Sequence, residues 1–274
     1  MMKALLLLVG VCGASFVSVN NNTVVYTECE RMGHGGASVV VTAIRQASDE
    51  TCQFGGTVII KCEGEAMNRE AVLLRSFEAT RHIYIDTVRR ERSADVCIVM
   101  RRLGMSLEAH RDARLGETWS WPTVASVGLI LLEAVKEFHT GGLAHTDLHV
   151  GNVLYVSPDD NTHITPIDVG SMALLEDTAK QTVVGLVSED LKQVLMSMRF
   201  LIDGNRAYFA EKRFDYVTKG REALSGAPDE FRQAMAYVYS IRKMEEVDYA
   251  RIQALLLGII RAAGIEPVHG QVLW

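Results

Sequence analysis

Apolar positions follow two different spacings along the chain. Over about the first hundred residues, short β-branched runs alternate with glycine pairs, which predicts strands at 24–26, 38–42, 57–61 and 96–100. One stretch of helical spacing, from Met67 to Phe77, interrupts these runs. We therefore expect a β-rich N-terminal region that contains one helix.

After Trp119 the spacing becomes helical. Apolar residues three to four positions apart mark a first helix: Val124, Val127, Leu131, Val135 and Phe138. Ser120 is a candidate N-cap for this helix, and Pro122 lies in its first turn. The same spacing predicts two further helices, which stop at Gly204 and Gly264.

The fold class that these patterns predict is α+β, with a β-rich N-lobe over about 23–100 and a helical C-lobe over about 104–274. Of the 274 residues, 48% are hydrophobic and 23% are charged, a composition that excludes intrinsic disorder as the main state. The formal charge of -6 argues against a nucleic-acid binder. It is compatible with a nucleotide site, where one lysine and a metal ion supply the positive charge.

The N-terminal segment 1–14 has the layout of a secretory signal peptide. A single lysine precedes an apolar run and then small residues, with Cys12 and Ala14 as candidate cleavage-site residues. The apolar run is too short to span a bilayer, and a buried N-terminal strand is the alternative interpretation. We expect a secreted or lumenal domain over 15–274 with no stable membrane anchor.

Cysteines fit this compartment. Without Cys12 the chain keeps Cys29, Cys52, Cys62 and Cys97, an even number that allows three pairings in an oxidising lumen. The sequon Asn21-Asn22-Thr23 follows the proposed cleavage site.

The polar residues with the clearest chemical meaning lie in the run His145-Thr146-Asp147-Leu148-His149-Val150-Gly151-Asn152. Asp147 and Asn152 lie on one expected loop, and Asp168 follows after a short hairpin. This arrangement suits phosphoryl transfer, in which one carboxylate accepts the proton of the attacking hydroxyl and the other two side chains hold metal ions. The alternative is a set of loop residues that cap turns.

Phosphoryl transfer also requires a lysine and a glycine-rich turn. The segment from Arg31 to Val40 is glycine-rich and lies between two expected strands, although an ordinary hairpin turn would have the same composition. Lys61 ends the strand predicted at 57–61, and Glu70 lies in the following helix. The complete order of glycine loop, lysine, glutamate, H-x-D-x-x-x-x-N and D-x-G favours a kinase.

At this point the chain resembles the protein-kinase fold and, within it, the casein kinase I family. The resemblance extends from about Arg31 to the C-terminus and includes segments without a catalytic role: 97–108, 188–191, 228–231, 247–249 and Trp274. In that family the segment 97–108 corresponds to the hinge, and 188–191 opens the large central helix.

The resemblance implies ATP and Mg²⁺ as cofactors and assigns roles residue by residue. The ATP site would include Gly33, Gly35, Ser38, Val40, Ile59, Lys61, Glu70, Met100 and Leu103. Asp147 would be the catalytic base, with Lys61 on the phosphates and His149 beside the γ-phosphate. Asn152 and Asp168 would hold the metal, Met100 would be the gatekeeper, and Asp190 would bind the catalytic-loop backbone.

Several positions depart from the family pattern. Thr146 replaces the arginine that reads a phosphorylated activation loop, and His149 replaces a lysine. Ile59 stands where an alanine usually faces adenine, and Val169 replaces the phenylalanine of D-F-G. The segment from Gly170 to Asp190 is short and offers little platform for a peptide substrate.

The kinase fold also bears on the cysteines. Its strands that carry Lys61 and Met100 are neighbours, and Cys62 and Cys97 alternate away from those two residues. The prediction is either a Cys62–Cys97 disulfide, with Cys29–Cys52 remaining, or buried free thiols.

Three functions follow. The first is a secreted, Mg·ATP-dependent protein serine/threonine kinase of casein kinase I type, whose protein substrate the sequence does not identify. The second is a pseudokinase that binds a partner, suggested by Ile59, Ser38, Val169 and the short segment after Gly170. The third is a small-molecule kinase, suggested by His149 and the missing peptide platform.

Overall fold

The computed structural model describes residues 15–20, 24–35, 38–47, 57–62, 66–90, 96–113, 119–176, 179–204, 224 and 226–274. The predicted signal peptide, the sequon and Cys52 lie outside these residues, as does the side chain of Cys29. The chain divides into two compact units. The N-terminal unit runs to Ser76 and resumes over Arg81–Arg102, and the C-terminal unit comprises Phe77–Thr80 and Leu103–Trp274.

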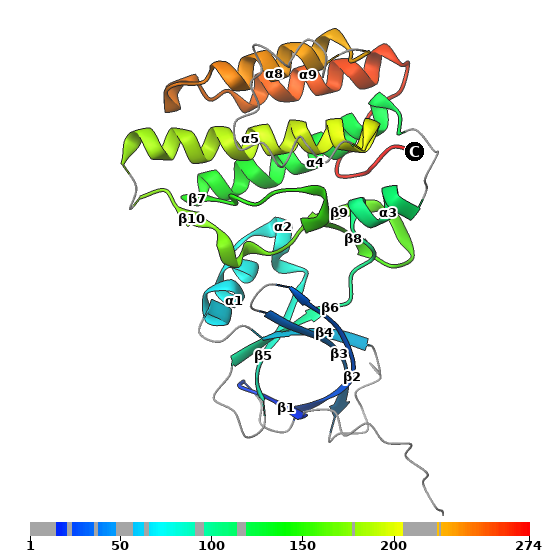
Figure 1. The fold of residues 1–274 in the computed structure, drawn as a ribbon, viewed down its shortest axis with the longest axis vertical. Coiled ribbons are helices and arrows are strands. Elements are labelled where there is room, and N and C mark those ends of the chain that lie inside the picture. The colour runs from blue at the N-terminus through cyan, green and yellow to red at the C-terminus, as the bar shows by residue number, and fades with distance from the viewer. Residues whose placement is uncertain are drawn as a thin grey trace, which may run out of the picture. The chain divides into compact units, whose positions relative to one another are not determined.

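In its described residues, the N-terminal unit is a closed antiparallel barrel accompanied by helix α1 (Ala66–Ser76). Its strands occur in the barrel order β1-β2-β3-β4-β6-β5 (Figure 1). Their bounds are β1 (Ser15–Ser18), β2 (Val24–Gly35), β3 (Ser38–Ala47), β4 (Thr57–Cys62), β5 (Tyr84–Arg90) and β6 (Val96–Arg101). The four predicted strands and the helix are confirmed. Two strands were not predicted: β1, which is only four residues long, and β5, in which three of the seven residues are charged.

Alternation along β4 separates two kinds of side chain. Val58 and Ile60 belong to the apolar cluster that fills the barrel, and Cys62 packs against the same cluster. The other members of this cluster are Tyr26, Val41, Ala43, Val88, Cys97 and Val99. Because successive strand residues point to opposite faces, Ile59 and Lys61 face outward from the barrel.

The C-terminal unit is built on two pairs of long helices. α4 (Trp121–Thr140) and α5 (Lys180–Asp203) form one layer, and α8 (Asp229–Ser240) and α9 (Tyr249–Ala262) form a second (Figure 1). The Ser120 side chain accepts a hydrogen bond from the Thr123 amide and caps α4, as predicted. At Gly128 an added Cβ would lie 2.4 Å from Met198 Sδ, so the absent side chain lets α4 approach α5 closely.

The beginning of α5 corrects one expectation. The segment 188–191 does not open the central helix, because α5 already begins at Lys180. The helix ends at Gly204, whose φ of 73° is the left-handed conformation that glycine adopts easily. The long helix therefore occupies sequence that precedes Asp190, and this shortens the connection that follows Asp168.

Short elements position the loops of this unit. β8 (Val153–Ser157) pairs with β9 (Asp160–Pro166), and β7 (Leu143–Ala144) pairs with β10 (Ala173–Leu174). The described residues also include α2 (Glu78–Arg81), α3 (Leu107–Ala113) and 3-10 turns at Val150–Asn152, Val169–Ser171 and Met244–Glu246. Among the described residues, no helix has the length and apolarity needed to cross a membrane.

Candidate active site

The N-terminal unit holds a buried ion pair. Lys61 Nζ lies 3.1 Å from Glu70 Oε1 and 3.0 Å from Oε2, so the ammonium group contacts both carboxylate oxygens. The side chains are 11% and 2% exposed. Strand β4 directs Lys61 outward from the barrel, and α1 presents Glu70 to it. The predicted pairing of these two residues is confirmed.

Strand register connects Lys61 with the glycine-rich segment. Gly33 is the cross-strand partner of Val40, and Val40 in turn is the partner of Lys61. The pairing of β2 with β3 extends to Gly35 and Ser38. The side chains of Ser38 and Val40 lie outside the description, and their contact with a nucleotide stays a prediction.

The other predicted nucleotide contacts also have defined positions. Ile59 of β4 is the cross-strand partner of Met100 of β6, and both side chains are half-buried. Leu103 begins the second stretch of the C-terminal unit and is half-buried. Its neighbour Gly104 donates a hydrogen bond from its amide to the Tyr155 carbonyl at 2.8 Å.

A disulfide lies on the other side of β4. Cys62 and Cys97 are directly opposite in the β4–β6 register and form a bond, with their Cα atoms 4.3 Å apart. Cys97 is fully buried in the barrel cluster. The predicted disulfide is confirmed, and it joins the strand that carries Lys61 to its neighbour.

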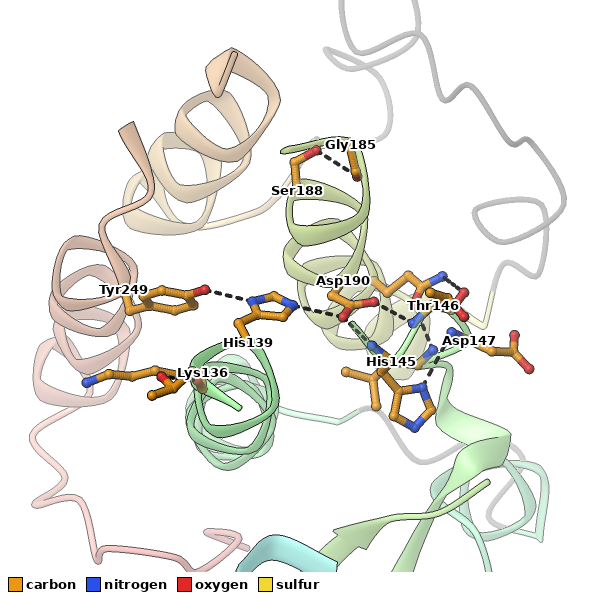
Figure 2. Close-up of polar contacts among 12 residues, drawn as sticks. Lys136, His139, His145, Thr146, Asp147, Gly185, Ser188, Asp190 and Tyr249 are labelled. Carbon is orange, nitrogen blue, oxygen red and sulfur yellow. Dashed lines mark hydrogen bonds and ion pairs between the residues drawn. The ribbon is translucent and has the colours of Figure 1, made fainter. Parts of the chain in front are cut away.

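The loop 145–152, which is the predicted catalytic loop, is held in the C-terminal unit by one buried carboxylate. Asp190 Oδ2 accepts a hydrogen bond from the His145 amide at 2.6 Å, and Oδ1 accepts one from the Thr146 amide at 2.8 Å. Asp190 is fully buried, and the predicted role of binding the loop backbone is confirmed. Asp147 points away from Asp190 (Figure 2), and more than half of its side-chain surface is exposed.

The Gln193 side chain also hydrogen-bonds the loop backbone, a contact that the sequence analysis did not predict. Its Oε1 accepts from the Leu148 amide at 2.7 Å, and its Nε2 donates to the Thr146 carbonyl at 3.3 Å. Gln193 lies three residues after Asp190, so both side chains project from the same face of α5. This three-residue spacing after Asp190 is the feature of the sequence that could have identified Gln193.

Two residues of this site have positive φ angles. Thr146 has a φ of 67° and Asp168 a φ of 63°. For a β-branched residue such as Thr146 this conformation costs about 1–3 kcal/mol, so the surrounding bonds must hold it. Thr146 Oγ1 also donates to the Ser171 carbonyl at 3.3 Å, which ties the loop to the turn after Asp168.

His145 makes a further connection to that turn. Its Nε2 lies 3.0 Å from the Ile167 carbonyl, and its ring is completely buried. Burial lowers the pKa of His145, although the negative charge of Asp190 opposes the shift. The ring is therefore neutral at physiological pH, with Nε2–H as the donor to Ile167.

Asn152 and Asp168 lie at the open end of the β8–β9 hairpin. Val153 pairs with Pro166, and the Ile167 amide donates to the Asn152 carbonyl at 2.8 Å. Asn152 Nδ2 donates to Asp147, at 3.0 Å to its carbonyl and 3.2 Å to Oδ2. The amide group of Asn152 thus leaves Oδ1 as an oxygen ligand.

These oxygens suit a magnesium ion. Asn152 Oδ1 and the Asp168 carboxylate are the hard ligands that Mg²⁺ prefers, with water and phosphate oxygens completing its shell. Within the described ranges, no group of three or more His, Cys, Asp or Glu side chains is placed to hold a metal by itself. Asn152 and Asp168 would supply two of the oxygen ligands of a bound Mg²⁺.

His149 is oriented by the same loop. Its Nδ1 accepts a hydrogen bond from the Gly151 amide at 3.1 Å, so in the neutral ring Nε2 carries the proton. Nε2 lies 4.0 Å from Asp147 Oδ2, too far for a hydrogen bond. Val169, the substitute for the D-F-G phenylalanine, is completely buried.

Comparison with known sequences identifies the family. The sequence model of the ABC1 atypical kinase-like domain matches residues 60–198, just over half of the chain. The chain belongs to this ABC1 atypical kinase-like family. The matched region of this family member contains Lys61, Glu70, Asp147, Asn152 and Asp168. No curated protein sequence matches the chain significantly.

Comparison with solved structures supports the fold. The structure of vaccinia related kinase 3 is similar to this ABC1-family chain, with a TM-score of 0.66 at 12% sequence identity. The match covers 94% of this chain and 93% of the other. The predicted kinase-like α+β fold is confirmed, whereas the resemblance to casein kinase I stays a prediction.

Proposed function

We propose that this protein transfers the γ-phosphate of Mg·ATP to a hydroxyl group. The observation that carries the proposal is the catalytic loop. The Asp147 carboxylate is exposed, and the backbone on both sides of Asp147 is hydrogen-bonded to the side chains of Asp190 and Gln193. A carboxylate fixed in this way suits a base that receives the proton of an incoming hydroxyl.

Each group has a defined part in this reaction. The acceptor oxygen forms a bond to the γ-phosphorus, the bond from that phosphorus to the bridging oxygen of ADP breaks, and Asp147 receives the hydroxyl proton. Asn152 and Asp168 would hold Mg²⁺, which when bound offsets negative charge on the phosphates. Lys61, oriented by Glu70, is suited to contact phosphate oxygens.

The acceptor we propose first is a protein serine or threonine hydroxyl, as the resemblance to casein kinase I implies. We also propose that the protein works in a secretory or extracellular compartment. The Cys62–Cys97 disulfide supports this location, because such bonds persist in oxidising surroundings.

A small hydroxylated molecule is the second candidate acceptor. The observation in its favour is the beginning of α5 at Lys180, which leaves a short connection after Asp168. In protein kinases, the segment between the D-F-G motif and this helix carries the activation-loop site and the A-P-E motif. A protein acceptor would then have to be recognised elsewhere on the molecule.

The test is transfer of labelled γ-phosphate from Mg·ATP by the oxidised protein. Acidic proteins, basic proteins and small polyols would serve as acceptors in separate reactions. Asp147→Ala and Asp168→Ala should each lower transfer at least about a thousandfold, because each removes a group that acts on the reacting phosphate. Asp159→Ala is the matched control, since Asp159 is an exposed residue at the turn of the same β8–β9 hairpin.

Three outcomes separate the hypotheses. Transfer to proteins that depends on Asp147 and Asp168 supports the first acceptor class, and transfer only to small polyols supports the second. If the folded protein gives no label above the level of Asp168→Ala, the transferase proposal is wrong. The pseudokinase that binds a partner is then the better hypothesis.

A further inference from the structure

A continuous hydrogen-bonded chain leads from helix α9 to the catalytic loop. Tyr249 Oη lies 2.7 Å from His139 Nδ1, and His139 Nε2 lies 2.9 Å from Asp190 Oδ2. Figure 2 shows His139 between the Tyr249 hydroxyl and the Asp190 carboxylate, which in turn faces the loop backbone. The His139 and Asp190 side chains are 4% and 0% exposed, so the inner part of the chain is shielded from water.

The donor and the acceptor of each hydrogen bond in this chain can be assigned from Asp190 at one end and Tyr249 at the other. Asp190 Oδ2 already accepts a hydrogen bond from the His145 amide, and as an acceptor oxygen it leaves the proton between it and His139 on His139 Nε2. In the neutral ring Nδ1 is then an acceptor. Burial, and after it the nearby charge of Asp190, raise the pKa of Tyr249 to about 12, so the phenol keeps its proton and its O–H donates a hydrogen bond to Nδ1.

The bonds of Asp190 determine what this chain controls. The same carboxylate accepts from the His145 and Thr146 amides, on the N-terminal side of Asp147. Thr146 has a φ of 67°, an unfavourable angle for its type, and these bonds help to maintain it. If the Asp190 side chain becomes less fixed, the backbone at 145–146 should move and change the orientation of the Asp147 side chain.

We propose that Tyr249 is a positioning residue for Asp147, which it orients through His139 and Asp190. By donating to Nδ1, Tyr249 fixes the His139 tautomer and rotamer that present Nε2–H to Asp190. The inference rests on the proposed transferase function, because positioning has a kinetic meaning only for a reaction at Asp147. Tyr249 lies outside residues 60–198, the region that matches the family.

The C-terminal unit offers a matched control. The Tyr155 hydroxyl is hydrogen-bonded to His110 Nδ1, and both residues are buried. This second tyrosine–histidine pair lies on β8 and α3, and neither residue belongs to the hydrogen-bonded chain from Tyr249 through His139 to Asp190. Tyr155→Phe therefore removes the same kind of bond as Tyr249→Phe without shortening the chain to Asp190.

The kinetic test compares these two variants under saturating and limiting ATP. Tyr249→Phe should lower kcat about fivefold to tenfold and leave KM for ATP within about twofold, because it loosens the base but not the nucleotide contacts. Tyr155→Phe should leave both constants within about twofold. Equal kinetics of Tyr249→Phe and the unaltered protein would overturn the proposal.

A second pair of variants tests the route through His139. In His139→Gln, the glutamine amide can still donate to Asp190 but makes no equivalent of the Nδ1 contact with Tyr249. Adding Tyr249→Phe to His139→Gln should therefore change kcat by less than about twofold. A full additive loss in the double variant would show that Tyr249 acts by another route and would overturn the proposal.

Amide hydrogen exchange decides the matter independently of turnover. Tyr249→Phe should raise exchange at the His145 and Thr146 amides about tenfold, while amides in the middle of α4 keep their protection. Absence of turnover in the unaltered protein would refute the transferase proposal alone, and the exchange result would still stand. Unchanged exchange at these two amides would overturn the positioning role.

Discussion

The two units hold their functional side chains in different ways. In the N-terminal unit, Lys61 is placed by the alternation of one strand and meets Glu70, which follows it closely in sequence. In the C-terminal unit, Asp147 is placed by α5 side chains that lie more than forty positions away. Strand alternation is a local rule, whereas the catalytic loop depends on contacts that only the folded chain creates.

The two units also differ in how a buried charge is satisfied. Glu70 faces an ammonium group, and an apolar pair of similar volume can replace such an ion pair. Asp190 instead satisfies two backbone N–H groups and a histidine, which remain polar whatever residue replaces it. From this comparison we expect Asp190 to be needed for the folded structure of the loop, whereas under the proposed function Lys61 and Glu70 are needed to contact the phosphates.

The largest effect is expected from Asp190→Ala. This change leaves the His145 and Thr146 amides and His139 Nε2–H without their buried acceptor, which should lower the free energy of unfolding by about 3–5 kcal/mol. Urea unfolding monitored by tryptophan fluorescence measures the loss. Glu189→Ala is the control, because Glu189 is the neighbouring residue, is about half exposed and makes only a surface ion pair with Lys192, so its loss should cost no more than about 0.5 kcal/mol. Equal losses in the two variants would contradict the assigned role of Asp190.

The disulfide should give the next largest effect, confined to the N-terminal unit. Replacing both cysteines in Cys62→Ala/Cys97→Ala removes a cross-link between residues 35 apart in sequence, worth about 3–4 kcal/mol by chain entropy. Hydrogen exchange should report faster opening of β4 and β6 but unchanged α4 and α5. Reduction of the unaltered protein with dithiothreitol should reproduce the shift. Equal acceleration in both units would show that they unfold together.

Much of the N-terminal unit could be predicted from local rules. The period of two along β4 put Lys61 on one face and Cys62 on the other, and the kinase resemblance made Cys97 its neighbour. β1 was not predicted, because four residues are too few to show the alternation of apolar and polar positions that marks a strand. Closure of the barrel is thus a property of pairing that no single segment reveals.

In the C-terminal unit, the sequence predicted the candidate catalytic residues but not the residues that hold their loop in place. The order of Asp147, Asn152 and Asp168 pointed to phosphoryl transfer, whereas His139, Gln193 and Tyr249 were missed. His139 and Tyr249 are separated by 110 positions and meet only because α4 packs against α9. The beginning of α5 at Lys180 was not predicted either, because the resemblance of 188–191 to casein kinase I placed the start of this helix later.

The ion pair gives a way to sharpen the comparison. Lys61→Met should lower the free energy of unfolding by about 3 kcal/mol, because it removes the cation that contacts the buried Glu70 carboxylate. Adding Glu70→Leu should recover all but about 1 kcal/mol of this loss, yet the double variant should not transfer phosphate. Thermal unfolding and the labelled-ATP assay measure the two quantities. If the second change fails to restore stability, the contrast with Asp190 is wrong.

The smallest effect concerns the alkaline stability of the C-terminal unit. The pKa of Tyr249 is raised to about 12, above the ordinary value of 10.0, so the unfolded chain loses this proton first as pH rises. Stability from Tyr249 is therefore complete below pH 10 and is lost as pH rises through about 12. Because the side chain is only half-buried and partly screened by solvent, we expect a loss of about 1 kcal/mol. The stability difference between the unaltered protein and Tyr249→Phe should shrink by this amount between pH 9 and pH 12, since the other titrating groups cancel in that difference. A difference that stays constant over this range would mean that the Tyr249 proton contributes nothing to the chain that ends at Asp190.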